Sequence, residues 1–182
     1  MATAKKPVPP PAPPVTPPAA RLPLRLRMVE QPGKQPLDGG WWPQSRDLTT
    51  ELGDLVDNFP AEHGRVVRVI FSPPDWDDQP RRVPTKRGYV KVGFDAADDT
   101  HVMVLMTSER EELCVLVVPP DLSRAKGEEA LVAATTPGYA SSPTALLAAI
   151  RERPEIDEGE RWNDEGEAWW GSDTAPSYRN AT

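Results

Sequence analysis

The arrangement of apolar and polar residues predicts five β-strands between residues 21 and 118, three by alternation and two by continuous apolar runs. Residues 21–28 alternate strictly, which is typical of a half-buried strand. Pro23 places this strand at a sheet edge or its first residues outside the ladder. Residues 64–72 and 88–94 repeat the pattern, with expected inward-facing side chains at Val67, Val69, Phe71, Val90, Val92 and Phe94. Residues 101–107 and 112–118 are apolar on both faces, which predicts a hairpin in the middle of the sheet.

Three segments have the apolar spacing of helices. The first carries Leu48, Leu52, Leu55, Val56 and Phe59. Ser45 is its expected N-cap, Asp47 lies in its first turn, and Pro60 ends it. The second helix starts at about Ser123, and the third has Ser142 as cap and Pro143 at its first position. The predicted order is β-α-β-β-β-β-α-α, an α+β fold in which three helices pack on a mostly antiparallel sheet of about five strands.

Composition divides the chain into three parts. Residues 1–20 hold eight of the 23 prolines and almost no large apolar side chain, which predicts a disordered, extended arm. Residues 21–153 carry all the periodic segments and form the predicted single α+β domain. Residues 154–182 are acidic, have no period and contain tryptophans, which predicts a disordered tail.

The distribution of charge disfavours some classes of function. Residues 1–20 carry +2 and residues 154–182 carry −6, so the body between them accounts for −3 of the total of −7. A negative body disfavours nucleic-acid binding, which normally needs a basic face. The longest apolar run, residues 113–118, is far too short for a membrane span. One cysteine, Cys114, and no secretory leader favour a cytoplasmic location.

A tryptophan-rich motif follows the first predicted strand. It consists of Asp38, Gly39, Trp41, Trp42, Pro43, Ser45, Arg46, Asp47 and Leu48. Together with residues 64–83 and the strand that ends before Pro119, this motif resembles an uncharacterised actinobacterial family, a domain of unknown function whose members carry Asp-Gly-x-Trp-Trp-Pro-x-Ser-Arg-Asp-Leu. The likeness covers about residues 21–152. It implies an actinobacterial source and one folded domain, and it brings no activity, cofactor or partner.

Trp41 and Trp42 are the first candidate site. Adjacent side chains on an extended backbone face opposite ways, so we expect one indole inside the core and the other on a surface or in a groove. The structural interpretation is one core anchor and one lid. The functional interpretation is an aromatic wall of a binding site, helped by Arg46 and Asp47 at a helix N-terminus that favours anions. Arg46 and Asp47 could equally form only a salt bridge and a cap.

A second candidate cluster joins Trp76 to Arg81 and Arg82. A guanidinium could stack on the indole, or both arginines could hold a phosphate or carboxylate. The neighbouring residues Asp75, Asp77 and Asp78 favour the simpler interpretation of a solvated loop that neutralises its own charge.

The sequence contains no recognisable catalytic or metal-binding motif. Its two histidines, His63 and His101, do not have the spacing of metal ligands, and one cysteine cannot form a zinc site. Cys114 lies in an apolar strand, where a thiol is usually inert. We therefore assign no catalytic residue, no metal and no cofactor.

Two functional hypotheses remain from the sequence. In the first, the chain is a non-enzymatic cytoplasmic binding or regulatory module. Its acidic tail steers the encounter with a protein partner that has a basic, apolar groove, and aromatic side chains anchor it: Trp162, Trp169, Trp170 and Tyr178. In the second, the body binds, or acts on, a small anionic ligand near Trp41, Trp42, Arg46, Trp76 and Arg81.

Overall fold

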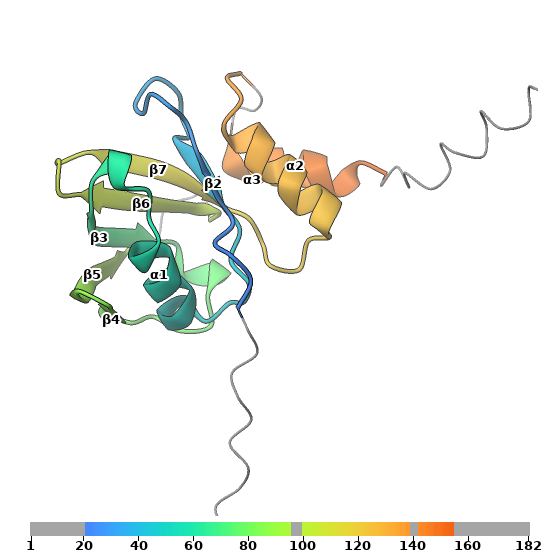
Figure 1. The fold of residues 1–182 in the computed structure, drawn as a ribbon. Helices are drawn as coiled ribbons and strands as arrows, with labels where there is room; N and C mark the ends of the chain where they lie inside the picture. The colour runs from blue at the N-terminus through green and yellow to red at the C-terminus, as the bar shows by residue number, and fades with distance from the viewer. Residues whose placement is uncertain (1–20, 96–99, 139–141, 155–182) are drawn as a thin grey trace, which may run out of the picture.

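A seven-stranded mixed sheet forms the centre of the protein in a computed structural model (Figure 1). The structure describes residues 21–95, 100–138 and 142–154. The strand order is β1-β2-β7-β6-β3-β5-β4, in which β2 pairs with β7 and β3 with β5 in parallel, while the other neighbours are antiparallel. The predictions for the proline-rich arm and for the acidic tail beyond residue 154 lie outside the described residues.

The strands and helices have the following bounds. The strands are β1 Leu26–Met28, β2 Gly39–Trp41, β3 Val66–Phe71, β4 Arg82–Thr85, β5 Gly88–Phe94, β6 Val102–Thr107 and β7 Glu112–Val117. The helices are α1 Leu48–Asp57, α2 Arg124–Ala134 and α3 Pro143–Glu152, with short 3₁₀ turns η1 at Ala61–His63 and η2 at Pro73–Asp75.

The α+β class and the three helices are confirmed, whereas a sheet of about five mostly antiparallel strands is wrong in detail. Strands β2 and β4 were not predicted. The sequence pattern does not indicate β2, because two of its three residues are glycines, which have no side chain to alternate. These glycines allow a close approach: a Cβ on Gly39 would lie 2.5 Å from the Arg27 carbonyl oxygen, and one on Gly40 would lie 3.0 Å from the Ala134 Cβ. Strand β4 contains Pro84, which an edge strand tolerates.

Three details of the predicted strands differ from the structure. The first strand covers only residues 26–28, and Leu22 before it is exposed. Val67 is exposed because the pairing of β3 with β6 shifts register between Val66 and Arg68, and such a shift turns the following side chains to the other face. Phe94, at the end of β5, is 66% exposed although the alternation predicted an inward-facing side chain.

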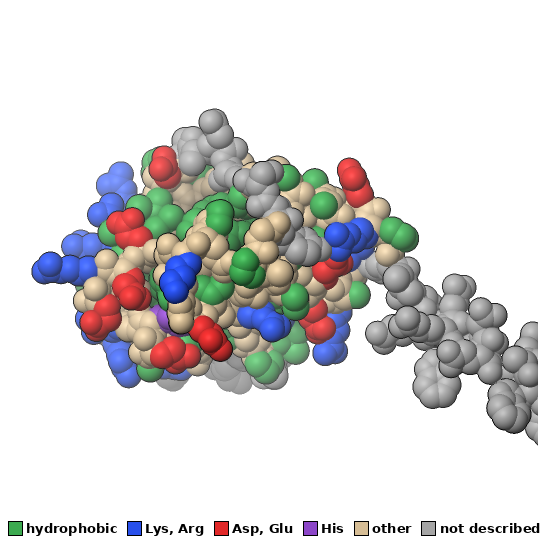
Figure 2. Space-filling model, turned by 90° about the horizontal axis from the view of Figure 1, so that it is seen from above, with side chains coloured by type: hydrophobic (Ala, Val, Ile, Leu, Met, Phe, Trp, Pro, Cys, Tyr) green, Lys and Arg blue, Asp and Glu red, His purple; other side chains and the backbone are tan. Residues whose placement is uncertain are grey.

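The helices form layers on the two faces of the sheet (Figure 1). Helix α1 packs beside β4, whereas α2 and α3 pack together over β1, β2 and β7. Lys and Arg side chains gather at the end of the molecule that β3, β4 and β5 form (Figure 2). No helix in the described ranges has the length and apolar character needed to cross a membrane.

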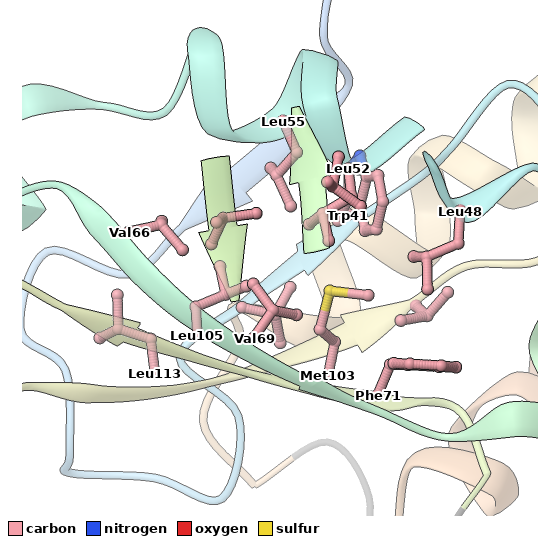
Figure 3. Packing of buried hydrophobic residues seen from close by; sticks show 14 of the residues in the cluster. Trp41, Leu48, Leu52, Leu55, Val66, Val69, Phe71, Met103, Leu105 and Leu113 are labelled. Atoms are coloured by element: carbon pink, nitrogen blue, oxygen red, sulfur yellow. The ribbon is translucent and has the colours of Figure 1, made fainter. Parts of the chain in front are cut away.

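Two hydrophobic cores lie on opposite faces of the sheet. The first joins α1 to the sheet through residues such as Leu52, Val69 and Leu105 (Figure 3). The second joins α2 and α3 to β7 through residues such as Leu116 and Ile150. The hairpin of β6 and β7 is confirmed, and β6 is the central strand of the sheet, as its apolar character on both faces indicated.

Two carboxylates cap the start of α1. Asp47, rather than the expected Ser45, is the N-cap, and its side chain accepts a hydrogen bond from the Thr50 backbone N–H at 2.9 Å. Asp78 accepts hydrogen bonds from the backbone N–H groups of Leu48 at 2.7 Å and Thr49 at 3.3 Å. The predicted cap of α3 is confirmed at Ser142. Helix α2, expected to start at about Ser123, begins at Arg124 with Ser123 as its N-cap.

Candidate functional site

Trp41 and Trp42 both lie inside the protein. Trp41 is 1% exposed in the core under α1, and Trp42 is 4% exposed in the core under α2 and α3. The two side chains face opposite ways, as expected, but the prediction that one of them lies on a surface is wrong. Helices cover both faces of the sheet at this point, so each indole has its own core.

Arg25 holds the backbone that follows Trp42. Its Nε donates to the Trp42 carbonyl oxygen at 3.0 Å, and its Nη2 donates to the Pro43 carbonyl oxygen at 2.6 Å. The guanidinium carbon also lies 3.7 Å from the centre of the Trp42 ring, a cation–π contact. Burial lowers the pKa of Arg25, and the negative charge of Glu51 partly opposes this effect.

Arg46 and Asp47 have structural contacts in the connection between β2 and α1. Arg46 donates to the Pro74 carbonyl oxygen at 2.7 Å and pairs with Asp77 at 3.3 Å, which ties the loop after η2 to the start of α1. Hydrogen bonds from Thr50 lower the pKa of Asp47. Because Asp47 and Asp78 accept from the free N–H groups of α1, the chain's own carboxylates occupy the anion site expected at this helix.

Trp76 packs against Trp41, with 5.5 Å between the ring centres, in a stacked arrangement. It is 6% exposed, so the indole belongs to the core rather than to a solvated loop. Arg81 and Arg82 are exposed, and Arg82 lies over the ring of Tyr89 at 4.7 Å. The structure therefore brings Trp76 together with Trp41 and Arg46, and it does not bring Arg81 or Arg82 to the same place.

A small pocket lies beside Trp76, at the edge of the sheet where β7 ends and β6 begins. Its volume is about 60 Å³. The motif region contributes Pro43, Ser45 and Arg46, the loop after β3 contributes Asp75 and Trp76, and His101 precedes β6. The remaining wall consists of Val117, Pro119, Pro120, Asp121 and Arg151. The pocket is thus lined by Val117 of β7, by Arg151 of α3 and by residues of the connecting segments.

Three buried polar atoms of these residues have no hydrogen-bond partner in the described part of the chain. They are Oδ2 of Asp75, Nε1 of Trp76 and Nδ1 of His101. His101 Nδ1 nevertheless lies 2.9 Å from Asp75 Oδ1, within the distance of an ion pair, so Asp75 Oδ2 and Trp76 Nε1 are the two atoms left without a polar partner among the described residues. The Asp75 side chain is 9% exposed. Since buried polar groups normally have partners, these two exceptions make the pocket the candidate site of the described structure.

The charges around the pocket are mixed. Two cationic residues, Arg46 and Arg151, and two acidic residues, Asp75 and Asp121, line it. Arg151 Nη2 lies 3.8 Å from Asp121 Oδ2. Trp76 Nε1 can only donate a hydrogen bond, whereas an ionised Asp75 can only accept one. The pocket therefore suits a small polar group that has both an acceptor and a donor. Within the described residues, no group of three or more His, Cys, Asp or Glu residues could hold a metal ion.

The sequence did not connect Asp75 with His101. In the sequence His101 lacks the spacing of a metal ligand, and Asp75 is one of several charges in a loop. The available signal was a histidine at the start of a buried strand and an aspartate beside a tryptophan, but only η2 brings them together. Trp162, Trp169, Trp170 and Tyr178 lie outside the described residues.

One known protein family matches the sequence of this chain. The model of a family described as "Family of unknown function (DUF5994)" matches residues 24–134, more than half of the chain. The chain belongs to this family. The DUF5994 match includes β1 to β7, α1 and α2, and it contains every residue of the pocket except Arg151. Neither the comparison with curated proteins nor that with solved structures found a match.

Proposed function

We propose that the chain is a binding module and that the pocket beside Trp76 takes a small polar ligand. The observation that carries this proposal is the pair of buried polar atoms, Asp75 Oδ2 and Trp76 Nε1, without partners among the described residues. Leaving such an atom unsatisfied costs about 1–3 kcal/mol. A ligand that bonds to both atoms would offset this cost.

The chemistry of the lining narrows the class of ligand. A volume of about 60 Å³ holds a few water-sized groups, so the pocket takes one end of a molecule or a small ion. The two arginines favour a carboxylate or phosphate, while Asp75 favours a donor such as an amine, an amide N–H or a hydroxyl. Molecules that have both kinds of group, such as amino acids, amides and hydroxy acids, are the first compounds to test.

Binding is testable on the full chain with a panel of amino acids, amides, hydroxy acids and inorganic phosphate. We expect at least one compound to raise the melting temperature and to change the tryptophan fluorescence, because Trp41 and Trp76 stack next to the pocket. The variants Asp75→Asn and Trp76→Phe each lose one hydrogen-bonding function. Affinity for that compound should fall about tenfold in each variant, the value of one bond to a buried or charged group.

Arg82→Ala is a matched control for these variants, because Arg82 is exposed on β4 and does not line the pocket. It should bind the compound as the wild type does. A compound that binds Asp75→Asn and Trp76→Phe with unchanged affinity would lie elsewhere, and the proposal would then be wrong. A panel with no binder would also count against it.

The contact of His101 with Asp75 supports a second candidate function. A carboxylate beside one imidazole nitrogen orients the ring, and this arrangement is common in histidines that transfer protons. The module would then act on its ligand by proton transfer. Conversion of a bound compound that stops in His101→Gln, while binding persists, is the result that distinguishes an enzyme from a binding module.

The cellular setting is a further part of the proposal. The family resemblance suggests an actinobacterial source, and the single cysteine favours the cytoplasm. The acidic, tryptophan-containing segment from residue 154 onward is suited to a protein partner. Pull-downs from a lysate with and without residues 155–182 test this partner, and identical sets of captured proteins would remove the segment from the proposal.

A further inference from the structure

A second, larger cavity lies at the opposite end of the sheet from the pocket. It is a groove of about 650 Å³ between the end of α1, the start of β3 and the turn that joins β4 to β5. The pairing of β3 with β5 begins only at Arg68 and Lys91, so the residues that precede this pair on the two strands line the groove. We call this cavity the basic groove.

Four cationic side chains line the basic groove: Arg65, Lys86, Arg87 and Lys91. All four are exposed, and none of them forms an ion pair with a described residue. The single acidic residue of the lining is Asp57, whose Oδ1 accepts a hydrogen bond from the Lys86 backbone N–H at 2.8 Å. The groove is therefore a positive site on a body whose overall charge is negative. Figure 2 shows Lys and Arg side chains at this end of the molecule.

Apolar side chains lie between these charges. Tyr89 is 55% exposed and Val67 is 38% exposed, and the partly buried Phe59 also lines the groove. The volume of the groove is within the range of pockets that hold drug-sized molecules, which is sufficient for an indole ring. An occupant that carries both acidic and aromatic side chains is complementary to this surface.

One segment of this chain has that composition. Residues 154–182 carry −6 and include Trp162, Trp169 and Trp170. The segment follows α3 directly. A folded unit of about 130 residues is about 36 Å across, and the stretch from residue 155 to Trp169 spans at most about 50 Å when extended. Trp169 and Trp170 are therefore within reach of the far end of the sheet.

We propose that the acidic segment of this chain, residues 155–182, docks in the basic groove. Carboxylates of the segment pair with the four cations, and an indole packs on Tyr89 and Val67. A protein with a stronger basic, apolar surface would compete for the same segment, so docking would regulate access to it. The proposal does not depend on the pocket beside Trp76, because the two cavities share no lining residue.

Zero-length cross-linking of the full chain with a carbodiimide tests the docking. This reagent joins a lysine amine to a carboxylate only when the two are in contact. Lys86 and Lys91 line the groove, whereas Lys34 lies in the connection between β1 and β2 and is an internal control. We expect links from the carboxylates of residues 155–182 to be concentrated on Lys86 and Lys91. A mixture of ¹⁴N- and ¹⁵N-labelled protein separates docking within one chain from docking between two copies, and links within one chain are the expected result.

Charge reversal provides the matched comparison. The double variant Arg65→Glu/Arg87→Glu should lower the yield of links at Lys86 and Lys91 about tenfold or more, because two attractions are replaced by two repulsions. Arg27→Glu/Arg124→Glu changes the net charge equally at sites outside the groove and should leave the yield unchanged. The melting temperature of each variant shows whether it is folded.

Two outcomes would overturn the docking. Links spread evenly over Lys34, Lys86 and Lys91 would mean that the groove serves a separate acidic protein or a nucleic acid instead. Equal yields in the two double variants would mean that the charges of the groove do not recruit the segment. Neither outcome changes the expected binding of small compounds beside Trp76.

Discussion

At the scale of single residues, the motif around Trp41 and Trp42 is explained mainly by packing. The two indoles enter different cores, and the glycines before them allow β1 and α2 to approach closely. The buried carboxylate of Asp38 accepts hydrogen bonds from the backbone N–H groups of Gly33 at 2.6 Å and Cys114 at 2.9 Å. Most of the motif therefore specifies how β2 joins the sheet, and Pro43, Ser45 and Arg46 also line the pocket.

Gly127 of α2 lies directly against Trp42, and its substitution tests this packing. A Cβ at this position would overlap the ring carbons of Trp42. Alanine in place of glycine favours a helix by about 1 kcal/mol, but overpacking a core costs about 1–3 kcal/mol. We expect Gly127→Ala to lower the free energy of unfolding, as measured by urea denaturation.

Gly53 of α1 is the matched control, because it is also a glycine inside a helix. A Cβ there would lie 3.3 Å from the Pro84 carbonyl oxygen, which is tight but not an overlap. Gly53→Ala should change the stability by less than about 1 kcal/mol, because the gain in helix propensity offsets the contact. A larger loss in Gly53→Ala than in Gly127→Ala would contradict the packing of Trp42 against α2.

At the scale of elements, α1 illustrates how a local signal and a distant residue combine. Asp47 caps the helix locally, but Asp78 reaches its first N–H groups from the loop after η2. Arg46 ties the same loop to the helix through the Pro74 carbonyl oxygen. The start of α1 and the pocket residues Asp75 and Trp76 are therefore parts of one connected unit.

Removal of the Asp47 cap should destabilise the protein in a pH-dependent way. Asp47→Ala should lower the free energy of unfolding by about 1 kcal/mol at neutral pH. The pKa of Asp47 is lowered in the folded protein by its hydrogen bonds with Thr50. The stabilisation by the charged form is therefore fully present above the unfolded pKa of about 3.9 and disappears as the pH falls through the folded value.

Urea denaturation of the wild type and of Asp47→Ala across this pH range measures the effect. The difference in stability between them should shrink as the pH falls. Asp47→Asn keeps an oxygen that accepts from Thr50 but does not titrate, so its stability relative to Asp47→Ala should change little with pH. A constant difference between the wild type and Asp47→Ala would argue against the charged cap.

At the scale of the whole molecule, the sheet separates two cores that share only the strands between them. Trp41 and Trp42 are neighbours in the chain but belong to different cores, whereas Trp41 and Trp76 are distant in the chain and stack at 5.5 Å. Stability effects in separate cores should add, and effects in one contact should not.

Double-mutant cycles with leucine substitutions test this separation. We expect a coupling energy of about 0.5–1.5 kcal/mol between Trp41→Leu and Trp76→Leu, because the stacked pair is lost only once. The coupling between Trp41→Leu and Trp42→Leu should stay within about 0.5 kcal/mol. Urea denaturation of the single and double variants provides both values. A larger coupling for the adjacent pair would mean that the two cores are not independent.

Much of the fold was predictable because periodicity records which face of an element is buried. The hairpin of β6 and β7, the start of α2 and the cap of α3 follow directly from apolar runs, serine and proline. Strand β2 was not predictable because glycine has no side chain to show a period. The exposure of Phe94 was not predictable either. Alternation shows which side chains of a strand share a face, but it does not show how far the hydrophobic core extends along that face.

The candidate site was only partly predictable. Trp41, Arg46 and Trp76 were correctly placed near one another. Arg81 and Arg82 were grouped with Trp76 because they are close in the chain, but β4 carries them away from the pocket. His101 and Asp75 were not grouped because nothing local connects a residue before β6 with one in η2.

The amino-acid sequence by itself determined the α+β class, the three helices, the central hairpin and the family, because each depends on periodicity, capping or a motif within a short stretch. Only the tertiary structure decided that both indoles are buried, that Asp75 meets His101, and that four cations meet around one groove. These are contacts between segments far apart in the chain, and they depend on which strands pair and which faces the helices cover.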